Sequence, residues 1–416
     1  MSAIASYRAL LRTVGPAYVT VAFLGRIPLA MSQLGTLILV STQTGRYALG
    51  GAAAGALAVA NALGAPFAGG LADRIGQRSV VLGQSLAGAL GLLVLVEATH
   101  RDLGAPTIIA LAALAGLLIP QIGPLARVRW GPMLRASDAS ADRRPRPGTP
   151  ARVRLLDAAF SYEGAADEAS FVLGPALVGV LAVIADPSGA LICAAVVLAA
   201  FGSWFALHPT AALTGSDRVP GQARGRLFGA AFIVLVLAQM CVGMVFGGTQ
   251  TGSTVLATTE GQPGLAGVIH ATLGVGSVIA GLAVTALPER VLYATRMLVS
   301  AIGLLVLSAP LLLVDSIGPL IGVIALLGFA VAPYMISNFA LAGHLVSDDR
   351  VGTAMTMLAG ATGIGYALGS SVAGRLADAL TSHTPAFAVT VAAAGIAVVL
   401  SLAAQRLLRD ARPPEL

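Results

Sequence analysis

The chain has 416 residues, of which 56% are hydrophobic and only 11% are charged. A soluble domain carries about a quarter charged residues, so the composition argues against a soluble enzyme and indicates many membrane spans. The net charge is +6 and all 25 basic residues are arginine, but they lie between apolar runs rather than on an aromatic-rich face, which argues against nucleic-acid binding.

Twelve apolar runs follow one another along the chain, each long enough to cross a hydrocarbon core of about 30 Å as a helix. They cover approximately residues 16–40, 48–70, 79–97, 104–125, 156–184, 188–207, 227–249, 264–287, 292–313, 317–345, 351–376 and 385–405. Backbone polar groups must be satisfied inside lipid, so each run is predicted to be a transmembrane α-helix. The first twelve residues are too weakly patterned for a cleaved signal peptide, and the first run is expected to stay as a span.

Arginine is distributed unevenly between alternate loops. If the N-terminus lies inside, the inner loops and tails carry nearly all of the arginines, the outer loops carry Arg46, Arg101 and Arg375, and Arg26 alone lies within a span. Because cytoplasmic loops are enriched in basic residues, this bias predicts twelve crossings of a plasma membrane with both termini cytoplasmic.

The stretch 209–225 separates six runs from six. It is rich in turn-forming residues, namely Pro209, Gly215, Pro220 and Gly221. It is therefore predicted to be a cytoplasmic linker between an N-terminal six-helix bundle over residues 1–208 and a C-terminal one over residues 226–416.

A second polar stretch runs from Arg127 to Arg154 and is longer than the predicted linker. Its many charges and its prolines predict a disordered loop. Arg127, Arg129 and Trp130 come after the fourth apolar run, so they are expected at the membrane interface.

The turn after the second run holds an acid, two bases and glycines within ten residues. Its pattern is carried by Gly69, Leu71, Ala72, Asp73, Arg74, Gly76 and Arg78. This pattern resembles the loop between the second and third spans of major facilitator superfamily transporters and departs from it at Gln77. The resemblance implies an all-α integral membrane protein with twelve transmembrane helices in two pseudo-symmetric six-helix bundles, and a transporter rather than an enzyme.

The same turn suggests a gate. Gly76 can adopt a positive φ without steric cost, and Arg74 and Arg78 suit an anionic inner leaflet. In the resembling family the carboxylate meets the N-terminal end of the eleventh span, whose exposed amides favour negative charge. We therefore expect Asp73 to contact the chain at 349–352 and to hold the inner side closed. The alternative is that the arginines only fix topology. A near-copy at 374–378 falls on the outer side and is assigned no gating role.

The fifth span carries several carboxylates. If the helix enters lipid near Leu156, Glu168 lies about 18 Å along its axis, close to the midplane. Helical spacing places Asp157, Ser161, Gly164, Glu168 and Pro175 on one face, and Glu163 and Asp167 on another. An ionised carboxylate is costly in hydrocarbon, so Glu168 and Asp167 are predicted to face protein or water and to carry a coupling proton. The alternative is that the span begins later and that Glu163 and Asp167 are interfacial.

Arg26 lies about 15 Å from the inner end of the first span and needs an anionic partner there. The candidates are Glu168, Asp167 or an anionic substrate, and either a proton-coupled pair or a permanent structural ion pair fits. The resembling family has an arginine in a proton-linked motif of the fourth span, and no counterpart occurs in residues 103–121.

A segment of the fifth span partly resembles a helix-packing motif of twelve-span bacterial drug/proton antiporters. It contains Gly174, Pro175 and Gly179, with Val178 in place of a glycine. Proline removes one helix hydrogen bond and small residues permit close packing, here expected between the two halves. A simple packing kink is the alternative.

Spans one, four, seven and ten line the central cavity in the resembling family. The resemblance therefore implies five candidate substrate-binding residues, which are Gln33, Gln121, Gln239, Tyr334 and Asn338. A single polar residue of this kind more often joins two helices by a hydrogen bond. His270 is interpreted as a packing residue, Cys193 and Cys241 as buried hydrophobes, and no metal or cofactor is expected.

The leading hypothesis is a secondary active transporter that moves a small apolar or cationic organic molecule by alternating access, as an efflux antiporter driven by proton exchange. Its expected partners are the substrate, protons and the lipid bilayer, with no nucleic acid, and it is expected to be a monomer. The alternatives are proton-coupled uptake of a polar metabolite and a non-transporting membrane sensor on the same scaffold.

Overall fold

The computed structural model describes residues 3–140, 150–184, 186–214, 227, 229–262, 265–287 and 291–410. Every regular element among these residues is a helix. In this part of the chain, twelve helices are long and apolar enough to cross a membrane, six on each side of residues 209–225. The twelve predicted runs are therefore confirmed as helices.

The N-terminal half contains α1 (Ala3–Thr44), α2 (Tyr47–Ile75), α3 (Gln77–His100), α4 (Ala105–Leu118), α5 (Ile122–Ser140), α6 (Pro150–Ile184) and α7 (Pro187–Val197). The sixth span continues from α7 through a π-helical turn, η1 (Leu198–Gly202), into α8 (Ser203–Leu207). The C-terminal half contains α9 (Ala230–Thr259), α10 (Ala266–Ala283), α11 (Tyr293–Ser308), α12 (Ile317–Leu345), α13 (Val351–Leu380) and α14 (Thr384–Asp410). Short 3₁₀ turns are η2 (Pro209–Thr214), η4 (Val284–Ala286), η5 (Ala309–Leu313) and η6 (Asp348–Arg350).

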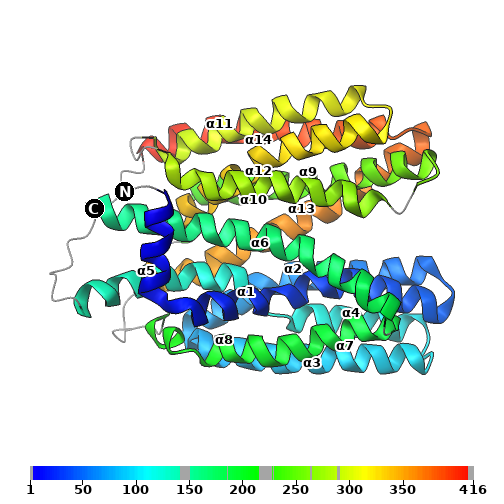
Figure 1. Ribbon diagram of the computed structural model, residues 1–416, viewed down its shortest axis with the longest axis horizontal. Helices are drawn as coiled ribbons and strands as arrows, with labels where there is room; N and C mark the ends of the chain where they lie inside the picture. The colour runs from blue at the N-terminus through cyan, green and yellow to red at the C-terminus, as the bar shows by residue number, and fades with distance from the viewer. Residues whose placement is uncertain are drawn as a thin grey trace.

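The two halves form two helical bundles that lie side by side along the long axis of the molecule (Figure 1). We call the end at which α1 begins and α14 ends the inner end, and the opposite end the outer end. Helices α2, α10, α6 and α13 run along the boundary between the halves, and α2 packs on α13 while α6 packs on α10. The fold is thus the two-bundle, twelve-helix architecture that the sequence predicted.

Small residues let helices approach closely across the bundles. A Cβ at Gly365 of α13 would collide with the Met240 carbonyl oxygen of α9, and a Cβ at Gly243 of α9 would collide with the Thr362 carbonyl oxygen of α13. The reciprocal arrangement means that the two helices touch through their backbones, which is how membrane helices associate without large side chains. These two glycines therefore serve close packing of α9 on α13.

The fourth span is longer than predicted. It consists of α4 and α5 together and runs from Ala105 to Ser137. Between the two helices, Asn61 of α2 donates hydrogen bonds to the carbonyl oxygens of Gly116 and Ile119, both at 2.9 Å, and accepts one from Gln121 at 2.6 Å. The prediction of a disordered loop from Arg127 to Arg154 is wrong at both ends, because α5 extends to Ser140 and α6 begins at Pro150. The remainder, 141–149, lies outside the described residues.

The first part of the predicted linker packs on the N-terminal half. Thr210 in η2 accepts a hydrogen bond from Arg129 of α5 at 3.1 Å. Residues 215–226 lie outside the described residues, so the linker there stays a prediction.

Two glycines permit sharp bends near the inner end. Gly76 joins α2 to α3 at a φ of 88°, in the left-handed region that was expected for the turn. Gly15 has a φ of 78° and bends the first helix, so that residues 3–14 run across the ends of the spans instead of along them (Figure 1).

Candidate functional site

A buried cluster of charges joins α1 to α6. The Arg26 guanidinium contacts Glu163 Oε2 at 2.6 Å through Nη2 and Asp167 Oδ1 at 2.9 Å through Nη1. Arg26 also donates to the Ala22 carbonyl oxygen of its own helix at 3.0 Å, and its side chain is only 4% exposed. The buried Arg26 guanidinium is thus paired with two carboxylates, one at each terminal nitrogen, through charge-assisted hydrogen bonds.

Arg127 and Trp130 of α5 complete the cluster. Arg127 Nη2 contacts Asp167 Oδ2 at 2.8 Å, and the Trp130 indole Nε1 donates to Glu163 Oε1 at 2.8 Å. Both side chains are buried, as is Arg129. The fourth span continues past its break and buries all three side chains inside the protein, and the expected position of Arg127, Arg129 and Trp130 at the membrane interface stays a prediction. The fourth span thus carries an arginine opposite the carboxylates of the fifth.

The cluster holds two guanidinium groups and two carboxylates, so its formal charges cancel. Glu163, which the sequence ranked below Asp167 and Glu168, makes the shortest contact with Arg26. Glu168 and Asp167 were both candidate partners of Arg26. Among the described residues Arg26 pairs with Asp167, as predicted, and with Glu163, but not with Glu168. Helical spacing separated Glu163 and Asp167 from Glu168, but it could not tell which face meets Arg26, because the partners come from other helices.

Glu168 occupies the other face of α6. Its side chain is buried beside Ser277 of α10, with Asp167 as the neighbouring acid on its own helix. On the same face, a Cβ at Gly164 would lie 2.9 Å from Ile336 of α12. The predicted two-face arrangement of the fifth span is confirmed. One face contacts α1 and α5, and the other contacts the C-terminal half. Within the described residues no arginine lies within ion-pair distance of Glu168.

Asp73 at the end of α2 caps the start of α13. Gly352 N donates to Asp73 Oδ1 at 3.0 Å, and Thr353 donates to Oδ2 through its backbone N at 2.7 Å and its hydroxyl at 2.6 Å. The negative charge thus lies on the exposed amides at a helix N-terminus, where it is most favourable. The expected contact with residues 349–352 is present, and its role as a gate stays a prediction.

A second polar contact crosses between the halves at the inner end. Asp157 of α6 accepts a hydrogen bond from the Tyr293 hydroxyl and pairs with Arg296 Nη1 at 3.2 Å, both from the start of α11. Asp157 and Arg296 are buried. Sequence reasoning missed this pair, although Asp157 was assigned to the correct face of its helix.

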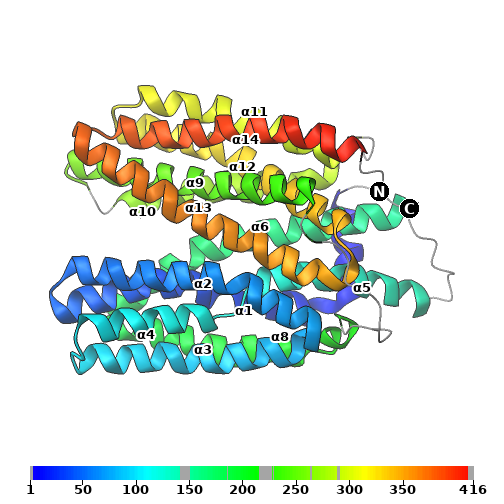
Figure 2. The same cartoon turned by 180° about the vertical axis from the view of Figure 1, so that it is seen from behind.

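The contacts between the halves gather toward the inner end. Arg135 of α5 pairs with Asp348 at 3.5 Å, and the Arg127 guanidinium lies 4.3 Å from the centre of the Phe339 ring of α12. Figure 2 shows α13 crossing toward α2 and α5 at the inner end, while the outer ends of α2 and α13 lie apart. The halves are therefore closed together at the inner end.

The predicted substrate residues are divided between hydrogen-bond networks and the cores of the halves. Gln239 accepts from Asn338 Nδ2 at 2.8 Å and donates to the Thr362 hydroxyl at 3.0 Å, which links α9, α12 and α13. Gln121 supports the break between α4 and α5, and Tyr334 is fully buried in the core of the C-terminal half. Gln33 is partly exposed. These hydrogen bonds favour the structural alternative for Gln121, Gln239 and Asn338.

The Gly174 segment packs within one half. A Cβ at Gly174 would lie 2.6 Å from the Cβ of Ala30 in α1, whereas one at Gly179 would meet nothing within 4 Å. The expectation that this segment packs between the halves is wrong for Gly174, which brings α6 against α1 close to Arg26. Pro175 lies inside α6 without ending it.

Gln77, the position at which the turn departs from the family pattern, has a structural explanation. Its Oε1 accepts from Arg129 Nε at 2.9 Å, and its Nε2 donates to the Leu125 carbonyl oxygen at 3.2 Å. Arg129 also lies 3.6 Å over the Phe205 ring. A second guanidinium at position 77 would face the buried Arg129 directly, so a neutral amide suits this site.

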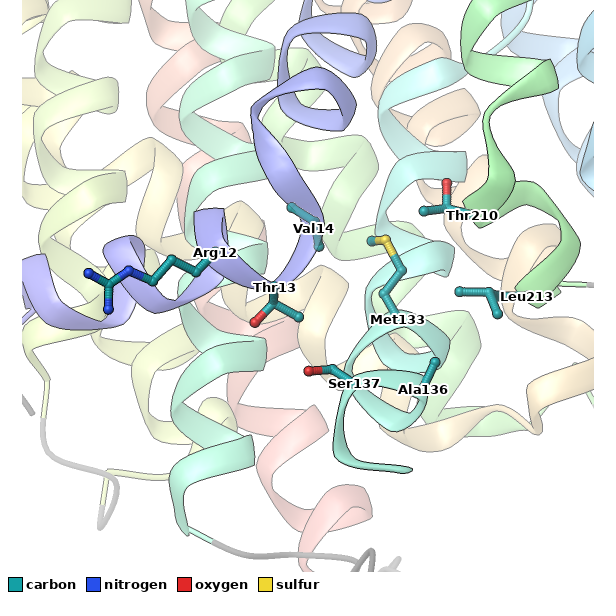
Figure 3. A pocket seen from close by; sticks show the side chains of 8 residues that line it. All are labelled: Arg12, Thr13, Val14, Met133, Ala136, Ser137, Thr210 and Leu213. Atoms are coloured by element: carbon teal, nitrogen blue, oxygen red, sulfur yellow. The ribbon is translucent and has the colours of Figure 1, made fainter. Parts of the chain in front are cut away.

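A hollow of about 530 Å³ lies at the inner end between the bend of α1, α5 and η2. It is lined by Arg12, Thr13, Val14, Met133, Ala136, Ser137, Thr210 and Leu213, and Arg12 points away from the other side chains (Figure 3). All of these residues belong to the N-terminal half and its linker. The hollow includes none of the predicted substrate residues and is not a path between the halves.

Comparison with known proteins agrees with this architecture. A family model described as Major Facilitator Superfamily matches residues 235–416. Three solved structures of transporters are similar over nearly the whole chain. The human organic anion transporter MFSD10 (TETRAN) has a TM-score of 0.68 at 20% identity, covering 94% of this chain and 99% of that one. A bacterial homologue of the iron transporter ferroportin, in an outward-facing state, has a TM-score of 0.66 at 16% identity, covering 94% and 99%.

The third structure is the E. coli fucose:proton symporter FucP, with a TM-score of 0.61 at 15% identity, covering 92% of this chain and 97% of that one. A search of curated proteins by sequence gave no match. At these identities the likeness establishes architecture and leaves substrate and coupling open. The chain has the twelve-helix fold of the major facilitator superfamily.

Proposed function

We propose that the protein is a secondary active transporter of the major facilitator superfamily, which moves a small apolar or cationic organic molecule across the plasma membrane by alternating access. The observation that carries this proposal is the arrangement of contacts between the halves. The hydrogen bonds and ion pairs among them gather toward the inner end, around Asp73 and Asp157. Rocking of one bundle against the other would exchange this closed end for an open one.

The moving bodies in this proposal are residues 1–208 and 226–416, joined by the linker 209–225, in a monomer with both termini in the cytoplasm. The closed inner end then makes this the state that admits substrate from outside. The inner closure must hold in one state and break in the other, and the hydrogen bonds of Asp73 and the ion pair of Asp157 are contacts that can form and break as the bundles rock.

Proton exchange is assigned to Glu168. An ionised carboxylate near the midplane is costly without a cationic partner, and this cost makes Glu168 the candidate proton carrier. Asp167, by contrast, is held between Arg26 and Arg127 at 2.9 and 2.8 Å. Within this proposal the Arg26 cluster keeps α1, α5 and α6 as one unit, and Glu168 on the opposite face of α6 senses the C-terminal half.

The test is transport by purified protein in vesicles. A panel of fluorescent organic cations and neutral sugars is presented under an imposed pH gradient, and the internal pH is followed with a trapped dye. The proposal expects movement of a cation against a proton flux. Movement of a sugar together with protons would support the uptake alternative. Binding of panel compounds without any flux would support a non-transporting sensor.

Glu168→Gln tests the proton site. The variant keeps the shape of the side chain and is expected to retain substrate exchange across the membrane while losing its dependence on the pH gradient. Glu97→Gln is the matched control, because Glu97 is an exposed carboxylate paired with Arg101 at 2.6 Å near the outer end. Gradient-driven transport by Glu168→Gln at the wild-type rate would remove Glu168 from the mechanism.

A further inference from the structure

The first residues of the chain form a separate helical segment at the inner end. Residues 3–14 belong to α1 but are turned away from the span by Gly15, whose φ is 78°. Figure 1 shows this segment lying across the ends of the spans, from the N-terminal bundle toward the C-terminal one. We name residues 3–14 the strap.

The strap is amphipathic. Ser6 and Leu10, one turn apart, are buried, and Leu10 packs in the core of the N-terminal half with Tyr18. Arg8 and Arg12 lie on the opposite face and are exposed. With a period of 3.6 residues, one face of the strap is thus fixed to the N-terminal half and the other is left to solvent or headgroups.

Tyr7 carries the strap across the boundary between the halves. Its hydroxyl donates to the Leu282 carbonyl oxygen, near the inner end of α10, at 3.0 Å. The same hydroxyl lies beside Thr285 of η4 and Ser161 of α6. Tyr7 therefore occupies the point where the strap, the fifth span and the eighth span meet.

Opening of the inner end would separate α6 from α10. Because Leu10 holds the strap on the N-terminal half, Tyr7 could not follow the C-terminal half, and its bond to Leu282 would break. A contact present in only one of two states shifts the equilibrium toward that state.

We propose that residues 3–14 act as a strap that stabilises the state closed at the inner end, through the Tyr7 hydroxyl and the bend at Gly15. The inference rests on alternating access as the proposed function. It adds a regulatory element outside the spans, which anything that displaces the N-terminus would release.

The experiment measures closure directly and does not require a known substrate. Spin labels are placed at Ala136 and Leu292, both exposed near the inner end on opposite halves, after replacement of Cys193 and Cys241 by alanine. The distance distribution between the labels gives the ratio of closed to open molecules in lipid nanodiscs.

Tyr7→Phe removes only the hydroxyl and is expected to lower the closed-to-open ratio about 3- to 10-fold, the effect of one neutral hydrogen bond. Thr13→Val is the matched control, because the Thr13 hydroxyl bonds within the strap to the Ala9 carbonyl oxygen at 3.0 Å. Gly15→Ala is expected to lower the ratio as well. Alanine is strained at this φ although nothing lies within 4 Å of its Cβ, so the effect acts through the bend.

Equal ratios in Tyr7→Phe and Thr13→Val would overturn the strap, as would an unchanged ratio after deletion of residues 2–13. A protein that transports nothing but shows the Tyr7→Phe shift would keep the strap and refute the proposed function. A protein that transports normally but shows no shift in Tyr7→Phe would keep the proposed function and refute the strap.

Discussion

Replacement of Asp73 by asparagine tests whether the cap on α13 closes the inner end. The carboxylate accepts three hydrogen bonds, two from backbone amides and one from the Thr353 hydroxyl, at 2.6 to 3.0 Å. Asparagine keeps one acceptor oxygen and loses the negative charge at the helix N-terminus. Hydrogen bonds to a charged group contribute roughly 1.5–3 kcal/mol, so we expect a loss of about 2 kcal/mol in the closed state.

A loss of this size lowers the closed-to-open ratio about 30-fold, since 1.4 kcal/mol corresponds to about tenfold. The assay is the distance distribution between spin labels at the inner end in nanodiscs. Transport should fall while membrane insertion and the amount of folded protein stay unchanged. Thr353→Val, which removes only the 2.6 Å hydroxyl bond, should produce a smaller shift in the same direction.

Asp378→Asn is the matched control. Asp378 ends the near-copy of the Asp73 pattern and is exposed near the outer end of α13. The same substitution there should leave the distance distribution unchanged. If Asp73→Asn and Asp378→Asn gave the same closed fraction, the cap would be only a local feature of the helix end and the reasoning would fail.

Three further predictions concern buried polar contacts. Asp157→Asn removes the carboxylate that pairs with the buried Arg296. Breaking a buried pair from one side is expected to cost about 3–5 kcal/mol. The distance between the inner-end labels should lengthen, and an unchanged distance would refute a closing role. In Arg26→Ala, Glu163 keeps the hydrogen bond from the Trp130 indole but loses its contact with a guanidinium. Thermal unfolding in detergent should therefore begin at a lower temperature than in Arg26→Lys. Equal melting temperatures in the two variants would contradict a strongly coupled cluster. Gln77→Leu should destabilise the N-terminal half by about 1–3 kcal/mol, because a buried guanidinium donor loses its acceptor; chemical unfolding followed by tryptophan fluorescence measures this, and wild-type stability would refute it.

Hydropathy and charge decided the architecture before any contact was known. Twelve spans, their grouping into six and six, and the two faces of the fifth span follow from local sequence. A span is recognised by its own length and composition, and its faces by its own helical period. The Asp73 contact also followed, since a motif at a turn needs only a short chain segment to be recognised.

The C-terminal end of the fourth span was beyond the reach of the same reasoning. Pro120 interrupts the apolar run, and Arg127 and Arg129 lower the hydropathy beyond it, so a local measure ends the helix there. The chain nevertheless continues as a buried helix. Asp167 pairs with Arg127, and uncharged oxygen atoms of Gln77 and Phe205 accept hydrogen bonds from Arg129. Those partners are distant in sequence.

The sequence by itself determined how many helices are long and apolar enough to cross a membrane and which residues share a face of one helix, because these properties belong to single segments. Only the tertiary structure decided which carboxylate pairs with Arg26, which arginine pairs with Asp157, and that residues 3–14 bridge the halves. Pairing depends on the rotation and depth of each helix relative to its neighbours. Those are set by the packing of small residues across whole helices, which no single segment specifies.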